Sequence, residues 1–173
     1  MKKIKFPAVI STFIVCYAFW ILITWSLHYE ELIAGAVVSL AVSLFSSRFF
    51  IHEKAFYLFN PVKLIVLLFY SLIIFMWELI KANWDVARRA LSPSLPINPG
   101  IVRVPSELKS EYGQAMLANS ITLTPGTITM EVTEKVGQPY YYIHWIDVST
   151  SDPKKAGVAI KGTLEKWIRR IWQ

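Results

Sequence analysis

The stretch Leu117-Ala-Asn-Ser-Ile-Thr-Leu-Thr-Pro-Gly-Thr127 joins the end of a predicted helix to the start of a predicted strand. Proline fixes its own φ and glycine accepts a positive φ, so Pro125-Gly126 is a turn signal at this junction. The stretch offers hydroxyl groups and one amide, but neither a nucleophile–base pair nor a set of metal ligands. We interpret it as a structural or docking corner formed by Asn119, Thr122, Thr124, Pro125, Gly126 and Thr127.

Two interpretations of the turn itself stay open. The backbone N–H groups and hydroxyls of Thr124-Pro-Gly-Thr127 are able to hold an anion such as phosphate. Alternatively, the turn is a plain connection in which the threonines satisfy their own backbone, and this is the interpretation that we favour.

The residues around the corner predict a small α+β domain of order βαββα, an open-faced sandwich spanning residues 101–173. Ile101–Val104 alternates as a short strand. Ser106 is the expected N-cap of a helix that reaches about Asn119. Thr127–Thr133 and Tyr140–Val148 alternate in the same way and predict a hairpin.

The last segment predicts an amphipathic helix that covers the sheet. Asp152 is its expected cap, and Pro153 fits the first helical position. We expect this helix to pack on the sheet rather than lie on a membrane surface, because a small sheet needs a cover. Its apolar stripe is Ile160, Leu164, Trp167, Ile168 and Ile171, and its polar side carries Lys161, Lys166, Arg169 and Arg170.

The chain is too apolar for an ordinary soluble domain. Its residues are 54% hydrophobic, against about 45–50% in soluble proteins, and its mean hydropathy is +0.43. Nearly all the excess lies before residue 81. The sequence therefore predicts membrane helices within residues 1–91, a proline-rich linker at 92–100 and the small domain after it.

Three apolar segments predict helices at about 6–27, 32–50 and 61–84. The first follows three lysines, but it is too long for a signal peptide and no small-residue cleavage site follows it. The second is short, and its small residues, Gly35 among them, would let helix backbones approach closely. We expect it to form a tight hairpin with the first, with a re-entrant or interfacial helix as the alternative.

Glu78 lies near the end of the third segment. An ionisable residue in a membrane span is a candidate for an ion path. The alternative, which we favour, is an end-of-helix anchor that pairs with Lys81 three residues later.

The basic residues give conflicting signals for orientation, since basic residues favour the cytoplasmic side. A cytoplasmic N-terminus is favoured by Lys2, Lys3 and Lys5, and a cytoplasmic second loop by Arg48, Lys54 and Lys63. With three spans these choices place the small domain outside, yet Lys81, Arg88 and Arg89 favour a cytoplasmic position for it.

Several function classes find no support in the sequence. The net charge of +6 is dispersed and lacks an RNA- or DNA-binding motif, so we expect no nucleic-acid partner. Walker, G-x-G-x-x-G and G-x-S-x-G patterns are absent from the sequence. His144 has no Cys or His at metal-ligand spacing, and its spacing to Ser120, Thr124 and Asp147 does not support a hydrolytic site. We expect no catalytic residues, no cofactor and no metal.

Three motifs carry a resemblance to a known family. They are Val104-Pro-Ser-Glu-Leu-Lys-Ser110, the corner stretch 117–127 and Tyr142-Ile-His-Trp-Ile-Asp-Val148. With the apolar segments and Pro99-Gly100-Ile101, they resemble the E subunit of Mrp-type multisubunit sodium/proton antiporters over nearly the whole chain. Related subunits occur in archaeal membrane-bound hydrogenase and sulfur-reducing complexes.

The resemblance implies a non-catalytic accessory subunit that supports assembly and stability of a complex for Na+/H+ translocation. In this family the larger subunits carry the ion path. The implied partners are those subunits and the lipid bilayer, and the implied location is the cell membrane, multi-pass, with the small domain in the cytoplasm. The alternatives are the equivalent subunit of a hydrogenase-type respiratory complex and a membrane-anchored anion-binding module.

Overall fold

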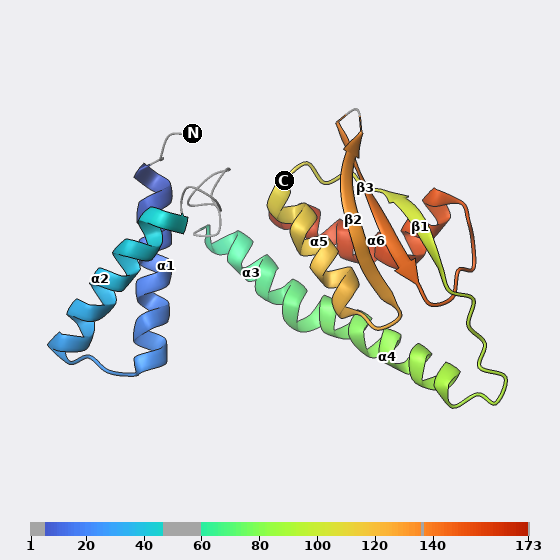
Figure 1. Cartoon of the computed structure of the whole chain (residues 1–173), viewed down its shortest axis with the longest axis horizontal. Helices are drawn as coiled ribbons and strands as arrows, with labels where there is room; N and C mark the ends of the chain where they lie inside the picture. The colour runs from blue at the N-terminus through green and yellow to red at the C-terminus, as the bar shows by residue number, and fades with distance from the viewer. Residues whose placement is uncertain (1–5, 47–59, 136, 173) are drawn as a thin grey trace. The chain divides into compact units, whose positions relative to one another are not determined.

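A computed structural model describes residues 6–46, 60–135 and 137–172 (Figure 1). It divides into two units, Met1–Pro61 and Val62–Gln173, which are described separately. Three of its helices are long and apolar enough to cross a membrane: Phe6–Thr24, Tyr29–Ser46 and Pro61–Ala90. The predicted membrane region followed by a small α+β domain is confirmed.

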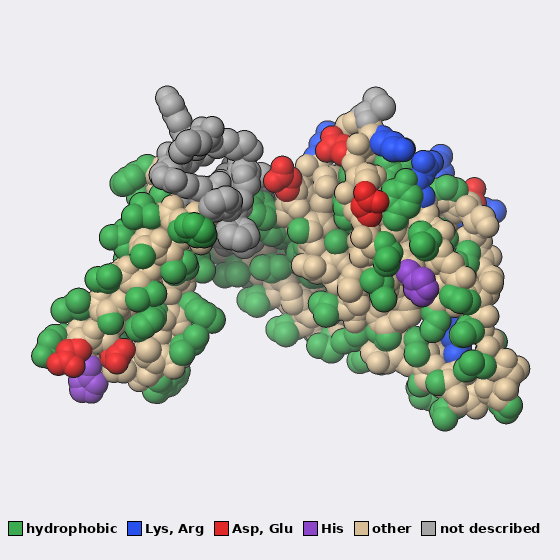
Figure 2. All heavy atoms as spheres, in the orientation of Figure 1, with side chains coloured by type: hydrophobic (Ala, Val, Ile, Leu, Met, Phe, Trp, Pro, Cys, Tyr) green, Lys and Arg blue, Asp and Glu red, His purple; other side chains and the backbone are tan. Residues whose placement is uncertain are grey.

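The first unit is a hairpin of α1 (Phe6–Thr24) and α2 (Tyr29–Ser46). Small residues make the close approach possible, since a Cβ added at Gly35 would overlap the indole ring of Trp20. The Trp20 indole N–H also donates to the carbonyl of Glu31 at 3.1 Å. The outer surface of the hairpin is covered by hydrophobic side chains, as expected of a surface in contact with lipid (Figure 2).

The hairpin differs from the prediction at its ends. α1 ends at Thr24 rather than at residue 27, and α2 begins at Tyr29, before the expected start at 32. Glu30 and Glu31 occupy the first turn of α2, where acidic side chains favour the helix dipole. The predicted continuation of this helix over 47–50 lies outside the described residues.

The second unit begins with one long helix made of α3 (Pro61–Phe69), the π-helical segment η2 (Tyr70–Phe75) and α4 (Met76–Ala90). A helix is present at the predicted 61–84 and continues to Ala90. A π-helical turn inserts an extra residue into an α-helix and is often found at functional positions.

The small domain contains a three-stranded antiparallel sheet of order β1-β3-β2. Its strands are β1 (Gly100–Pro105), β2 (Thr127–Lys135) and β3 (Gln138–Trp145). Helix α5 (Glu111–Leu123) lies between β1 and β2 in the chain, and α6 (Pro153–Trp172) follows β3. The βαββα order is therefore confirmed.

One face of the sheet and the two helices enclose the core. Alternate strand residues such as Val104, Tyr141 and Ile143 are fully buried there. Leu117 from α5 and Ile168 from α6 meet them. The opposite face leaves large apolar side chains exposed, namely Ile101, Ile128 and Met130.

The helix between β1 and β2 starts later than predicted. Ser110, not Ser106, is the N-cap of α5 and accepts a hydrogen bond from the Gly113 N–H at 3.4 Å. Ser106 instead donates its hydroxyl proton to the Glu165 carboxylate on α6. That contact holds residues 106–109 outside the helix, while α5 extends to Leu123 instead of ending near residue 119.

The final helix begins as predicted but differs on its polar side. Asp152 Oδ1 accepts the N–H groups of Lys154 and Lys155, both at 2.9 Å. Lys161, expected to be solvated, is only 6% exposed and pairs with Glu165 one turn later. The ion pair allows a lysine to occupy a buried position, because it supplies the partner that a buried charge requires.

Candidate functional site

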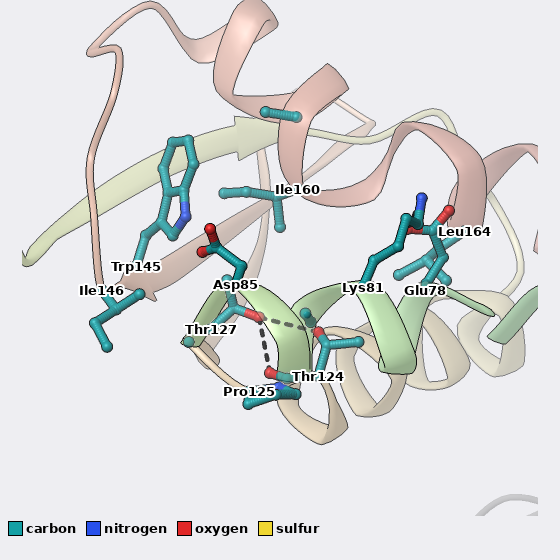
Figure 3. Close-up of a pocket in the computed structure, with 13 residues that line it drawn as sticks. Glu78, Lys81, Asp85, Thr124, Pro125, Thr127, Trp145, Ile146, Ile160 and Leu164 are labelled. Atoms are coloured by element: carbon teal, nitrogen blue, oxygen red, sulfur yellow. Dashed lines mark hydrogen bonds and ion pairs between the residues drawn. The ribbon is translucent and has the colours of Figure 1, made fainter. Parts of the chain in front are cut away.

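The corner between α5 and β2 is held by its own threonines (Figure 3). Thr124 Oγ1 and Thr127 Oγ1 each donate to the carbonyl of Ile121 at 2.7 Å, and the two oxygens lie 3.1 Å apart. The hydroxyl protons are thus directed at the backbone rather than at a ligand. This arrangement favours the plain connection over the anion-binding turn.

Gly126 has the positive φ expected at this turn, 93°. Its carbonyl accepts the Ile146 N–H at 2.8 Å, which fastens the corner to the end of β3. A Cβ added at Gly126 would lie 3.0 Å from Cγ2 of Ile146 and 3.5 Å from Cγ2 of Val86 on α4. Both the backbone conformation and the close packing therefore require glycine here.

A pocket of about 250 Å³ adjoins the corner. Its walls come from α4, the corner, the end of β3 and α6 (Figure 3). Glu78 lies on one wall, and its carboxylate pairs with the Lys81 ammonium at 2.7 Å, as the spacing predicts. The pocket brings together Glu78, Thr124, Pro125, Gly126 and Thr127.

The other two corner candidates lie elsewhere on α5. Asn119 is exposed. Thr122 is exposed too, and its Oγ1 donates to the Ala118 carbonyl at 2.9 Å and accepts the Thr129 N–H at 3.2 Å. Thr122 therefore ties α5 to β2 without lining the pocket.

Arg89 joins several segments of the second unit, whereas the sequence pattern indicated for it only a preference for the cytoplasmic side. Its guanidinium binds the Asp85 carboxylate at 2.7 Å, the Asp147 carboxylate at 2.7 Å and the Pro96 carbonyl at 2.7 Å. One side chain thus joins the end of the long helix, the linker and the segment after β3. The spacing of Asp85 and Arg89, one helical turn, was the available signal.

Tyr70 was not anticipated as a domain contact either. It lies in η2, is 2% exposed, and shares a 2.7 Å hydrogen bond between its hydroxyl and Ser120 Oγ on α5. The sequence contains no local signal for this pair, because the two residues are 50 positions apart. The pair joins the long helix to the domain core.

A second polar cluster surrounds Glu165. Its carboxylate accepts the Ser106 hydroxyl, the Glu107 N–H at 2.8 Å and the Lys161 ammonium. Burial acts to raise the pKa of Glu165, but Lys161 and the two other donors outweigh it, and the net pKa is lowered. Burial and the nearby Glu165 charge raise the pKa of Tyr141.

In the described part of the chain, the residues considered for a hydrolytic site or a metal site do not form one. Ser120 bonds to Tyr70 and Asp147 to Arg89, so their hydrogen bonds do not build a hydrolytic site with His144. Within residues 6–46, 60–135 and 137–172, no three His, Cys, Asp or Glu side chains group in a way that could hold a metal ion. His52 lies outside the described residues.

Comparisons with known proteins agree on one family. Residues 13–171 match the family described as Na+/H+ ion antiporter subunit. The Na(+)/H(+) antiporter subunit E1 of Staphylococcus haemolyticus (strain JCSC1435) is 33% identical over 94% of this chain and 96% of its own length. Subunit E1 of Staphylococcus aureus (strain bovine RF122 / ET3-1) is 33% identical over 88% of this chain and 90% of its own.

A solved structure is also similar over nearly the whole chain. A chain of the membrane-bound sulfane sulfur reductase, an archaeal respiratory membrane complex, is 41% identical with a TM-score of 0.81. The match covers 95% of this chain and 99% of that chain.

Proposed function

Because the chain belongs to the E subunit family of Mrp-type Na+/H+ antiporters, we propose that it is a non-catalytic accessory subunit of a multisubunit cation/proton antiporter complex. It is a membrane protein whose partners are the larger subunits of that complex and the lipid bilayer. Its role is to support assembly and stability, and its small domain lies in the cytoplasm.

Two observations support this role: the family match covers most of the chain, and the hydroxyl groups of the corner are bonded to the backbone. The similarity runs through residues 13–171, so one family match includes both the membrane hairpin and the small domain. The corner threonines bond to the Ile121 carbonyl, and Glu78 bonds to Lys81. Side chains engaged in this way fix a shape, which suits a docking surface better than a reaction centre.

A second assembly is favoured by the match to the sulfane sulfur reductase chain, at 41% identity. The chain would then serve the same supporting role in a redox-coupled respiratory complex. Its partners would include redox subunits in addition to antiporter-like subunits.

Extraction from native membranes in mild detergent, followed by mass spectrometry, tests the proposal. Large antiporter-like subunits in fixed stoichiometry are expected, and redox subunits beside them would select the second assembly. A chain that purifies alone would refute the supporting role.

Glu78→Gln separates an accessory subunit from one that lines the ion path. We expect antiport activity per assembled complex to stay unchanged, because Glu78 serves as an anchor paired with Lys81. Lys81→Gln is the matched control. Loss of activity in Glu78→Gln alone, with assembly intact, would place this carboxylate in the ion path.

A further inference from the structure

The long helix Pro61–Ala90 has two unlike faces. Its inner face packs on the small domain, where Tyr70 joins the core and Val66, Leu67, Ile74 and Phe75 pack against it. Its outer face is apolar and exposed along most of its length, through Ile65, Leu72, Ile73, Trp77, Ile80 and Trp84. Among the described residues of the second unit, the small domain therefore covers one side of this helix and leaves the other exposed.

The domain reaches the middle of the apolar part of this helix. The Phe69 ring lies 5.2 Å from the Trp167 ring on α6, and the Arg170 guanidinium lies 4.4 Å above that same Trp167 ring. At 1.5 Å per residue, Phe69 is about 12 Å from Pro61 and about 16 Å from Ile80 along the helix.

These distances conflict with a membrane-crossing helix. The hydrocarbon core of a bilayer is about 30 Å thick, so an apolar run from Pro61 to Ile80 that crossed it would put Phe69 near the centre. The small domain would have to enter the hydrocarbon with it, carrying the Arg170 charge to the same depth. Charged side chains are rare and costly there.

We propose that Pro61–Ala90 lies along the membrane surface, with its outer face in the boundary between headgroups and acyl chains, and that only the α1–α2 hairpin crosses the bilayer. Helices with one apolar face bind membranes in this orientation. Trp77 and Trp84 suit it, because tryptophan prefers the interface. The binding partner of the outer face is thus a lipid surface.

The proposal also removes the conflict between the basic residues. With a single hairpin crossing, the N-terminus and everything after α2 lie on the same side of the membrane. The turn on the opposite side, residues 25–28, and the first turn of α2 contain Glu30 and Glu31 but no Lys or Arg. Basic residues then gather on one side, the cytoplasmic side by the positive-inside rule. They are Lys2, Lys3, Lys5, Arg48, Lys54, Lys63, Lys81, Arg88 and Arg89.

Labelling with a membrane-impermeant maleimide tests the sidedness. The full chain in native membranes, with Cys16→Ser as background, receives Asn60→Cys or Arg88→Cys, one at each end of the helix. Both are exposed, and both are expected to react from the cytoplasmic side. His28→Cys, in the turn of the hairpin, is the control and should react only from the other side. Reaction of Asn60→Cys and Arg88→Cys from opposite sides would overturn the proposal.

If the maleimide fails to reach one end of the helix, measurements of how deeply spin labels lie in the bilayer distinguish the two orientations. Spin labels at Ile65→Cys, Leu72→Cys and Ile80→Cys report collisions with oxygen and with a water-soluble nickel chelate. A surface helix gives three similar, shallow depths. In a helix that crosses the membrane, the label at Leu72→Cys would be the deepest. If another protein covers this face, the labels would be shielded from both oxygen and the nickel chelate. Either result refutes the proposal.

Discussion

Replacing Gly126 with alanine should destabilise the small domain through two separable effects. The first is conformational, because a φ of 93° is sparsely populated by residues with a Cβ and costs about 1–3 kcal/mol. The second is steric, because the added Cβ would lie 3.0 Å from Cγ2 of Ile146. Overpacking of this kind costs about 1–3 kcal/mol.

Gly137 offers a matched control for this change. It also has a positive φ, 74°, but a Cβ added there meets nothing within 4 Å. Gly137→Ala should therefore carry only the conformational cost. The difference between the two variants isolates the packing of the corner against the end of β3, and we expect about 1–3 kcal/mol.

Thermal unfolding of the detergent-extracted protein measures the difference. For a chain of this size, about 1 kcal/mol shifts Tm by about 2–4 °C, so Gly126→Ala should unfold several degrees below Gly137→Ala. A Gly126→Val variant should in addition lose co-purifying partner subunits, whereas Gly137→Val should keep them. Equal Tm values for the two alanine variants, with assembly unchanged in both valine variants, would refute a rigid corner.

Four further changes test contacts elsewhere. Tyr70→Phe should lower the free energy of unfolding by about 1–3 kcal/mol in chemical denaturation, because Ser120 Oγ is left buried without its partner. Glu165→Gln should cost about 3–5 kcal/mol in the same assay, since the buried Lys161 charge loses its counter-ion. In the unmodified protein, stability should decline in acid-unfolding experiments as pH falls past about 4.5 towards the lowered folded pKa of Glu165, and Glu165→Gln should remove that decline. Gly35→Leu should separate the two helices of the α1–α2 hairpin, because the added side chain would overlap the indole ring of Trp20. Loss of a crosslink between α1 and α2 measures this separation.

Controls separate these effects from general damage. Tyr29→Phe removes an exposed tyrosine hydroxyl bonded to Glu30 and should change stability little. Arg169→Gln breaks the more exposed pair with Glu107, which contributes at most about 1 kcal/mol. Tyr70→Phe at wild-type stability, or a Glu165→Gln effect no larger than that of Arg169→Gln, would show that the buried contacts are not the stabilising ones. An acid decline retained in Glu165→Gln would assign it to other carboxylates.

The regular elements of the domain could be predicted because their signals are local. Alternating residues mark β2, and the Asp152-Pro153 pair marks the start of α6. The start of α5 could not be chosen locally, since Ser106 and Ser110 are each followed by glutamate. The choice depends on Glu165, which lies 59 positions from Ser106.

The candidate site was predictable only in part for the same reason. The proline-glycine turn identifies the corner, and the three-residue spacing identifies the Glu78–Lys81 pair. The corner and the Glu78–Lys81 pair line the same pocket only because the long helix packs against the small domain. That packing is a tertiary contact, which the sequence does not show. The burial of Lys161 likewise depends on tertiary contacts, because a lysine on a helix is normally solvated.

The π-helical segment Tyr70–Phe75 acts as a phase correction within the long helix. A continuous α-helix turns about 100° per residue, so a stripe of contacts drifts around the axis over many turns. One extra residue resets this drift, and both α3 and α4 keep the same side turned towards the domain. Shortening this segment by a single residue would rotate α4 by about 100°. Arg89 would then turn away from Asp147 and from the Pro96 carbonyl, and Glu78 and Asp85 would turn away from the pocket that they line. The fit of the long helix to the small domain thus depends on the number of residues in the π-helical segment as well as on their chemistry.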